Sequence, residues 1–223
     1  MFNQSQQSGI DQVKRTVADL HQELVRYQLV VWTAGNISGR VPDSDLMVIK
    51  PSGVPYDRLT AASMVVTTLE GDVVQGESAA SSDTAAHGYI YRHLPEVGGV
   101  VHTHSPYATA WAACHQPIPA VLTMMGDEFG GEIPVGPFAL IGDDSIGRGV
   151  VETLKGSRSP AVLMANHGVF TIGPNPEQAV KAAVLCEEVA RTVYLAKQLG
   201  DPKLISPETV SKLYQRYQND YGQ

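Results

Sequence analysis

Apolar residues recur every three or four positions from about residue 9 to residue 28, and this spacing predicts an amphipathic helix. Similar patterns and capping signals predict helices over residues 83–94, 107–115, 145–154 and 176–199, and a last helix that begins at Ser206-Pro207. Short apolar runs bounded by turn residues predict strands over residues 46–50, 64–69, 73–74, 100–104 and 161–165, and one more that ends at Gly173. The segment Glu70-Gly71-Asp72 between two of these strands predicts a hairpin.

The order of these elements defines the expected fold class. Strands and helices alternate, but the hairpin and several short links exclude a purely parallel, doubly wound sheet. We therefore expect an α/β protein with a mixed, largely antiparallel sheet covered by helices. The sequence has no internal repeat, low-complexity segment or clear linker, so residues 1–223 are expected to form one domain.

The charge balance limits the classes of partner. The chain has 16 Lys and Arg and 23 Asp and Glu, a net charge of −7, and no Lys/Arg run is longer than a pair. This argues against nucleic acid or an anionic membrane as the main partner. The first residues do not resemble a signal peptide, and no apolar run reaches the roughly 20 residues that span a bilayer. We therefore expect a cytoplasmic protein in which Cys114 and Cys186 are reduced core residues.

The apolar run Val100-Val101 ends in a His-x-His pair, His102 and His104. Successive side chains of a strand point to opposite faces, so both imidazoles should lie on the same side of the strand. Two neutral imidazoles on one side can bind one divalent cation such as zinc. Taken alone, the pair is equally consistent with two half-buried histidines at the end of a strand.

A third histidine lies in a similar setting. His167 follows a predicted strand, between Asn166 and Gly168. Three histidines that leave the fourth position open form the ligand set of a catalytic metal site. The alternative for His167 is a turn histidine bonded to the backbone. The other histidines are expected to be packed or solvated, namely His21, His87, His93 and His115.

Three short polar segments have the composition of anion-binding loops. They are Gly35-Asn36-Ile37-Ser38, Lys50-Pro51-Ser52-Gly53 and Ser81-Ser82 at a helix start. Their hydroxyls, amides and glycines can bring backbone N–H groups close to a phosphate, although each segment alone could be a plain turn. The sequence has no Walker motif, and Gly147-Arg148-Gly149 lacks the context of a dinucleotide fingerprint, which argues against a nucleotide site.

Taken in order, these motifs point to one family. Thr33-x-Gly35-Asn36-x-Ser38, Ile49-Lys50-Pro51-Ser52-Gly53-Val54, Ser81-Ser82-Asp83-Thr84, His102-Thr103-His104-Ser105 and Asn166-His167-Gly168 together resemble the class II aldolase/epimerase superfamily over nearly the whole chain. The resemblance implies a three-layer α/β/α fold around a mostly antiparallel sheet. It also implies a C4 homotetramer with active sites at subunit interfaces, a phosphorylated sugar as substrate, and Zn²⁺ or another divalent cation such as Mn²⁺ or Co²⁺.

The same resemblance assigns roles to individual residues. His102, His104 and His167 match the metal ligands of the superfamily. Its phosphate-contacting positions are matched by Asn36, Lys50, Ser52, Gly53, Ser81 and Ser82.

The residues that differ between aldolases and epimerases resemble those of the epimerases. Asp83 stands where the aldolases have glutamate, and the epimerases place this aspartate at the metal. Thr123 replaces an aldolase tyrosine, Asp127 matches an epimerase acid/base, and Tyr221 matches the partner acid/base in the tail. The resemblance therefore implies a 4-epimerase that interconverts L-ribulose 5-phosphate and D-xylulose 5-phosphate. The loop after Pro137 is shorter than in the epimerases, which leaves the sugar open.

Two other functions fit part of the pattern. One is a class II aldolase that cleaves a related sugar phosphate, similar to L-fuculose-1-phosphate aldolase. The other is a non-catalytic binding module of the adducin type, which lacks a metal site; the complete set of three histidines argues against it. Purely structural roles for the acidic residues and the tail are a helix N-cap for Asp83, a solvated loop charge for Asp127 and a frayed terminus for Tyr221.

Overall fold

The protein is described by a computed structural model over residues 2–219. Residues 1 and 220–223, and with them the predicted acid/base Tyr221, lie outside the described residues. The described chain forms one eight-stranded sheet in the order β4-β3-β2-β1-β5-β8-β7-β6. The strands are β1 (Asn36–Arg40), β2 (Leu46–Ile49), β3 (Val65–Thr68), β4 (Val73–Gln75), β5 (Gly99–Thr103), β6 (Val135–Gly136), β7 (Ala161–Met164) and β8 (Gly168–Gly173).

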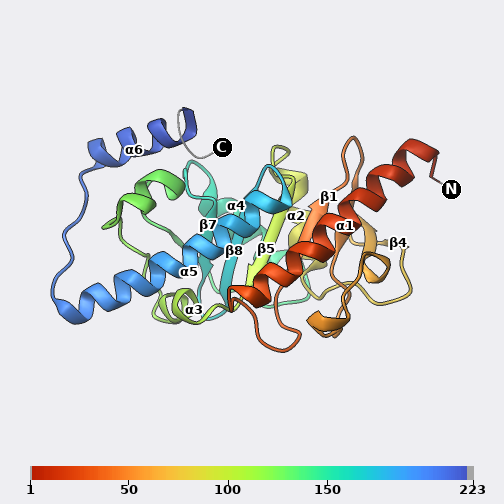
Figure 1. The fold of residues 1–223 in the computed structure, drawn as a ribbon, viewed down its shortest axis with the longest axis horizontal. Helices are drawn as coiled ribbons and strands as arrows, with labels where there is room; N and C mark the ends of the chain where they lie inside the picture. Colours follow the sequence, from red (N-terminus) through yellow and green to blue (C-terminus); the bar gives the residue numbers. More distant parts are fainter. Residues whose placement is uncertain (1, 220–223) are drawn as a thin grey trace.

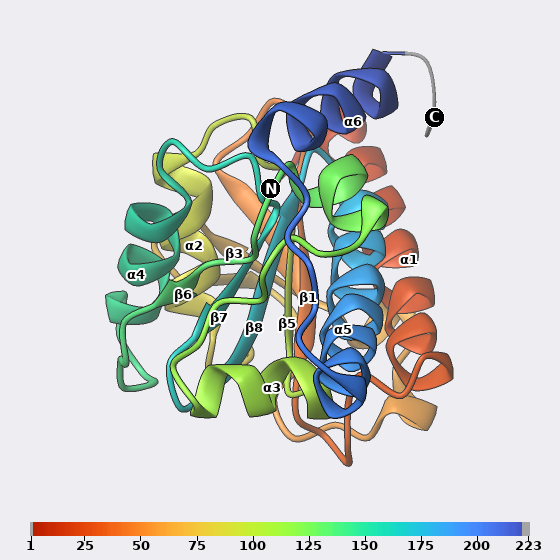
Figure 2. The same cartoon turned by 90° about the vertical axis from the view of Figure 1, so that its left-hand side faces the viewer.

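Helices flank this sheet on both faces. The α-helices are α1 (Gln4–Arg26), α2 (Thr84–His93), α3 (Pro106–Ala113), α4 (Ser145–Leu154), α5 (Pro176–Leu199) and α6 (Pro207–Asn219). Short helical turns are η1 (Tyr56–Arg58), η2 (Ala61–Ser63) and the π-helix η3 (Met125–Phe129). Helices α1 and α5 cover one face of the sheet, and α2 and α4 cover the other (Figures 1 and 2). The predicted three-layer α/β/α fold is confirmed.

The strand pairing is antiparallel except between β6 and β7. The central strand β5 pairs with β1 on one side and with β8 on the other. Its residue His102 lies opposite Asn36 of β1 and opposite Phe170 of β8. The ladder therefore fixes the backbone of His102 from both sides.

A buried histidine joins α1 to the sheet. The Nδ1–H group of His21 donates to the carbonyl of Val17 at 2.6 Å, and its Nε2 accepts a hydrogen bond of 3.0 Å from the Ile37 amide of β1. The side chain is fully buried. His21 is thus a satisfied core residue, as the sequence predicted for the histidines outside the ligand set.

Three local features differ from the prediction. Helix α1 begins at Gln4 because Asn3 and Gln6 form a capping box that the apolar spacing does not reveal. Residues 36–40 form a strand, although their polar and glycine content indicated a loop. The segment 118–137, over which the sequence predicted neither a helix nor a strand, contains the π-helix η3 and ends in β6.

The cysteine prediction was half right. Cys186 is buried in α5, as expected. Cys114 is exposed, so its assignment to the core was wrong. The reason is its place at the C-terminal cap of α3, in the exposed segment 113–117.

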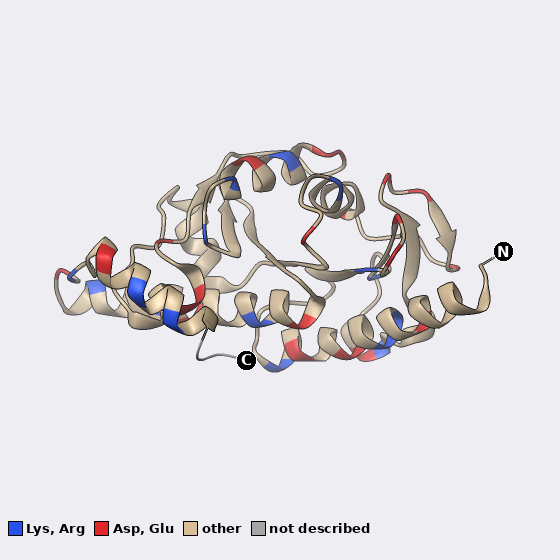
Figure 3. Ribbon diagram, turned by 90° about the horizontal axis from the view of Figure 1, so that it is seen from above, with Lys and Arg blue, Asp and Glu red and all other residues tan. Residues whose placement is uncertain are grey.

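Helices α3 and α6 lie at opposite ends of the strands (Figure 2). Helix α3 follows the end of β5, whereas α6 packs against η3. Figure 3 shows basic and acidic residues interspersed along the helices, as the composition suggested. Within residues 2–219, none of the helices is both long and apolar enough to cross a membrane.

Candidate active site

Three histidines meet at the end of the sheet where β5 ends and β8 begins. His102, His104 and His167 each present a ring nitrogen, and these three nitrogens lie within 4.8 Å of one another. The Nε2 atoms of His102 and His104 are 2.9 Å apart. Among the described residues, these three side chains form the one group of three or more potential metal ligands. The three predicted ligands therefore converge.

The strand and a backbone carbonyl set the orientation of His102. Its Nδ1–H group donates to the carbonyl of Val169 at 2.9 Å, and its ring stacks on Phe170 with a centroid distance of 4.2 Å. Because a carbonyl only accepts, this bond places the proton on Nδ1 and leaves Nε2 free to act as a ligand. A carbonyl partner of this kind is the usual support for a metal-bound histidine.

His104 lies one residue beyond the end of β5, which closes at Thr103. The sequence predicted both histidines on one strand, and the structure instead places the second in the loop that leads to α3. The two rings still face each other, with centroids 4.6 Å apart. The position of His104 therefore depends on the loop and on α3, not on the sheet ladder.

The turn between β7 and β8 carries His167. Asn166 adopts a left-handed conformation with φ of 56°, which asparagine tolerates better than most residues. At Gly168 a Cβ atom would lie 2.5 Å from the Thr103 carbonyl oxygen and 2.7 Å from the His104 ring. The motif Asn-His-Gly is thus required by geometry, since a side chain after His167 would displace the neighbouring imidazole.

Electrostatics keep the three imidazoles neutral. Burial lowers the pKa of all three rings below the usual 6.5, and neighbouring imidazoles lower the pKa of His102 and His104 further. The carboxylate of Asp83 acts in the opposite direction on His104 and His167. Neutral imidazole is the form that coordinates a metal.

The donor set fits a divalent cation. His167 Nδ1 is buried and has no hydrogen-bond partner within the part of the chain described, and His102 Nε2 faces another ring nitrogen at short distance. A cation between the rings would satisfy these nitrogens. Three neutral nitrogen donors are a ligand set that suits zinc and related metals.

Asp83 lies beside this cluster, held by an amide. The Nδ2 group of Asn36 donates to Asp83 Oδ2 at 2.6 Å and to the hydroxyl of Ser81 at 3.1 Å. Asp83 is buried, and its Oδ1 has no hydrogen-bond partner among the described residues. Although Asp83 occupies the N-cap position of α2, its side chain makes no capping hydrogen bond in the described structure. The geometry therefore does not support the alternative role of Asp83 as a helix cap.

A second buried network lies behind Asp83, and the sequence did not predict it. His87, one turn along α2, shares a 2.7 Å hydrogen bond with the hydroxyl of Ser38, which also contacts the phenol of Tyr91 at 2.8 Å. All three side chains are fully buried. The only sequence signal for this network was Ser38, which belongs to the motif that begins at Thr33. This network fixes the face of α2 that carries Asp83 against β1.

The predicted phosphate-binding segments are joined to each other. A bridge pairs Pro51 with Ala80, the Ser52 amide donates to the Ala79 carbonyl at 2.9 Å, and the Ser81 amide donates to the Lys50 carbonyl at 3.1 Å. Ser52, Gly53 and Ser82 remain exposed. The segments 50–53 and 79–82 thus form one polar surface beside the N-terminus of α2, next to Asp83.

Lys50 is buried beneath this surface. Its ammonium donates to the carbonyls of Thr33 and Pro51 at 3.1 and 3.3 Å, and burial lowers its pKa. The ammonium also lies 5.3 Å from the ring centroid of Tyr56. The described hydrogen bonds of Lys50 are therefore made to protein groups, as are those of Asn36. From these positions Lys50 can add positive charge, and Asn36 a hydrogen-bond donor, to the polar surface.

Asp127 does not join the histidine cluster. It lies in the π-helix η3, where its carboxylate is 3.6 Å from Arg216 of α6. The next residue, Glu128, is 3.0 Å from Lys181 in the second turn of α5, which begins directly after β8. His167 precedes β8, so η3 and the histidines lie at opposite ends of this six-residue strand, about 20 Å long.

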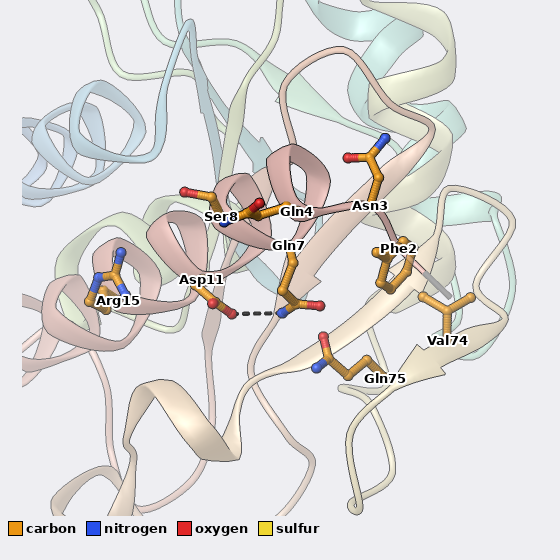
Figure 4. A pocket seen from close by; sticks show the side chains of 9 residues that line it. All are labelled: Phe2, Asn3, Gln4, Gln7, Ser8, Asp11, Arg15, Val74 and Gln75. Atoms are coloured by element: carbon orange, nitrogen blue, oxygen red, sulfur yellow. Dashed lines mark hydrogen bonds between the residues drawn. The ribbon is translucent and has the colours of Figure 1, made fainter.

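A separate cavity lies away from these residues. It measures about 860 Å³ and lies between the first turns of α1 and the edge strand β4 (Figure 4). Polar side chains dominate its lining, among them Gln7, which donates to Asp11 at 2.8 Å. In the sheet order this edge strand is four places from β5. The cavity is therefore unrelated to the histidine cluster.

Comparison with known proteins identifies the family. The class II aldolase and adducin N-terminal domain matches residues 15–194. Among solved structures, an L-fuculose 1-phosphate aldolase is similar over 93% of this chain and 96% of its own, with 28% identity and a TM-score of 0.87. Another similar structure is that of YgbL from Klebsiella pneumoniae, provisionally assigned as an aldolase, epimerase or decarboxylase. The similarity extends over 92% of this chain and 98% of the YgbL chain, with 26% identity and a TM-score of 0.81.

A third similar structure supports the fold alone. The L-fuculose-1-phosphate aldolase of Thermus thermophilus is 24% identical and has a TM-score of 0.70, covering 82% of this chain and 93% of its own. The family match spans most of the chain and includes all three histidines and Asp83. The protein therefore belongs to the class II aldolase/epimerase superfamily.

Proposed function

We propose that the protein is a divalent-metal-dependent sugar-phosphate 4-epimerase that interconverts L-ribulose 5-phosphate and D-xylulose 5-phosphate. The observation that carries the proposal is the cluster of His102, His104 and His167 beside Asp83, an aspartate held by Asn36. The superfamily includes enzymes of phosphorylated sugars, as the name of the similar L-fuculose 1-phosphate aldolase states. The preference for epimerisation rests on Asp83, Asp127 and the tail.

The three histidines would hold Zn²⁺, or Mn²⁺ or Co²⁺ in its place, and Asp83 would be a fourth ligand or a close neighbour. When bound, the cation supplies a Lewis acid that stabilises negative charge on the substrate oxygens. The chemistry needs such a group because the C4 proton lies β to the C2 carbonyl and is not acidic enough for direct removal. Cleavage of the C3–C4 bond avoids this step, and bond formation on the other face of the aldehyde inverts C4.

The polar surface beside α2 would bind the phosphate. The exposed Ser52, Gly53 and Ser82 and the start of a ten-residue helix offer hydroxyl and amide donors, and the Lys50 ammonium adds positive charge below them. Phosphate held here would keep the two-carbon aldehyde fragment from leaving while it rotates. An aldolase shares the cleavage step but releases the aldehyde.

Asp127 and Tyr221 would exchange protons with the C4 oxygen on the two faces of the aldehyde. Asp127 is too far from the histidines of its own subunit to do so, because it lies at the other end of β8. This separation supports sites shared between subunits, in which η3 and the tail of one copy reach the metal centre of the next. We therefore propose a C4 homotetramer with active sites at its interfaces.

The second candidate is a class II aldolase acting on a related sugar phosphate. It is favoured by the 28% identity to an L-fuculose 1-phosphate aldolase over nearly the whole chain. A non-catalytic, adducin-type role is disfavoured, because three neutral, convergent imidazoles suit a metal site, and His167 Nδ1 has no hydrogen-bond partner among the described residues. The proposed function is tested by incubating zinc-loaded protein with L-ribulose 5-phosphate. The assay follows D-xylulose 5-phosphate and free glycolaldehyde phosphate separately, before and after removal of the metal by a chelator.

A further inference from the structure

Helix α3 contacts both loops that carry the histidines outside the sheet. It begins at Pro106, two residues after His104. At its other end, the amide of Asn166 donates to the Ala112 carbonyl at 3.2 Å. The Nε2–H group of His115, just after the helix, donates to the side-chain oxygen of Asn166 at 2.5 Å. One short helix thus links the loop of His104 to the turn of His167.

A carboxylate from α5 holds the start of this helix. Glu187 Oε1 accepts a 2.9 Å hydrogen bond from the Tyr107 amide, and Glu187 Oε2 accepts one of 2.9 Å from the Ala108 amide. The N-cap residue Ser105 makes no side-chain capping bond in the described structure, and Pro106 has no amide proton. Glu187 therefore occupies the place of the missing cap and satisfies both free amides of the first turn.

Three properties make this contact strong. The two hydrogen bonds are charge-assisted and bidentate, a geometry that fixes direction as well as distance. The negative charge lies at the positive end of the helix dipole. Glu187 also belongs to the long helix α5, which is packed against the sheet and against α3. The loop that carries His104 is thereby held in place relative to α5 and the sheet.

We propose that Glu187 is a positioning residue of the metal centre, acting on His104 through the first turn of α3. His102 is held by two strand ladders, but His104 lies past the end of β5 and has no such support. An eight-residue helix is too short to be stable by itself, so its place depends on contacts with its neighbours. The inference rests on the metal-binding part of the proposed function, and it does not depend on which sugar is the substrate.

The direct test is the zinc affinity of Glu187→Gln, measured by competition with a chromophoric chelator. The amide keeps the size of the side chain but places an N–H group against one of the two backbone amides, so the first turn should shift. We expect a 10- to 100-fold larger Kd for zinc, the effect of losing an outer support of a metal ligand. The neighbouring Glu188 is exposed on the same helix, and Glu188→Gln is the matched control with unchanged affinity.

A spectroscopic readout separates positioning from general destabilisation. The visible spectrum of the Co²⁺-loaded protein reports the geometry of the ligands, so Glu187→Gln should change it while Glu188→Gln should not. Should Glu187→Gln fail to fold, Glu187→Asp replaces it, because its shorter carboxylate cannot reach both amides as Glu187 does. If Glu187→Gln has a Kd within twofold of wild type and an unchanged Co²⁺ spectrum, the positioning role of Glu187 is overturned, but the metal centre is not. Wild-type protein that binds neither metal would overturn the metal centre as well.

Discussion

Asn36 donates a 2.6 Å hydrogen bond to Asp83, joining the central part of the sheet to the N-terminus of α2. Asn36 is paired with His102 across β1 and β5, so the same residue adjoins both the carboxylate and the first predicted ligand. The bond engages Oδ2 and leaves Oδ1 of Asp83 without a partner in the described chain. The carboxylate is thus oriented by one oxygen, and the other is available to a cation or to substrate.

This relationship predicts a loss of activity on replacing Asn36. Asn36→Ala removes the donor that orients Asp83, and we expect kcat to fall by about 10- to 100-fold with the fold retained. If the amide acts through Asp83, the same change should have little further effect in an Asp83→Asn background. Kinetics of the two single variants and the double variant measure this coupling. Independent, additive losses would show that Asn36 acts elsewhere, for example on the phosphate.

The histidine cluster predicts one divalent metal per subunit. His104→Ala removes one of three nitrogen donors, so the purified variant should contain little metal and have no measurable turnover. The matched control is His93→Ala, because His93 is an exposed histidine on α2. Metal content by mass spectrometry and the oligomeric state by light scattering check the result. A His104→Ala protein with full metal content and rate would exclude His104 as a ligand.

Asp127 is predicted to act as a general acid/base. Asp127→Asn keeps the shape of the side chain but cannot take up the proton, so turnover should fall by roughly 10²–10⁴-fold with metal content unchanged. Arg216, the partner of Asp127 in its own subunit, provides a comparison: Arg216→Gln removes the 3.6 Å contact but not the carboxylate. An epimerisation rate of Asp127→Asn near wild type would exclude Asp127 as the general acid/base.

The separation of Asp127 from the histidines predicts complementation between inactive variants. His104→Ala subunits lack the metal centre but retain Asp127, and Asp127→Asn subunits have the opposite defect. Random mixing in a cyclic tetramer should complete about a quarter of the sites. Activity of the mixture, measured after subunit exchange has been demonstrated, should therefore rise to about a quarter of wild type. No recovery in exchanged tetramers would rule out sites shared across an interface.

Two buried histidines outside the ligand set predict acid lability. Burial lowers the pKa of His21 and of His87 to about 3, so both are neutral in the native state, while the unfolded chain binds protons below about pH 6.5. Their contribution to stability is therefore complete above pH 6.5 and is lost as the pH falls toward 3. Each group should make the free energy of unfolding decrease by about 1.4 kcal/mol per pH unit in this range.

The variant His21→Gln tests this pH dependence. Glutamine can donate to the Val17 carbonyl and accept from the Ile37 amide, as His21 does, but it does not titrate. Urea unfolding of the metal-free protein between about pH 4 and pH 6 should therefore show a slope smaller by about 1.4 kcal/mol per pH unit. Equal slopes for variant and wild type would mean that His21 does not control the acid transition.

Much of the fold could be predicted from local patterns in the sequence. The long helix α5 and strand β7 lie within a residue of their predicted bounds, because apolar periodicity reflects burial directly. Strand β1 was missed, since its residues have little preference for a strand and are held there by ladders on both sides. The start of α1 was missed because a capping box replaces the apolar signal.

The histidine part of the site could be predicted from the sequence, because imidazole is a common metal ligand. Imidazoles at the ends of strands indicated a metal site, and the structure brings all three together. The contact of Asn36 with Asp83, the network of Ser38, His87 and Tyr91, and the cap formed by Glu187 were not predictable. Each joins residues that are more than 40 positions apart in the chain. Such pairs are determined by the packing of helices on the sheet and on one another.

The measurement that tests the account most directly uses L-ribulose 5-phosphate labelled with deuterium at C4. Cleavage and re-formation of the C3–C4 bond leave the C4 hydrogen attached throughout, whereas removal of that hydrogen would exchange it with solvent. With zinc-loaded protein in ordinary water, NMR should show D-xylulose 5-phosphate that retains deuterium at C4, and a chelator should stop its formation. Loss of deuterium from the product, or release of glycolaldehyde phosphate with no D-xylulose 5-phosphate, would contradict a metal-dependent 4-epimerase.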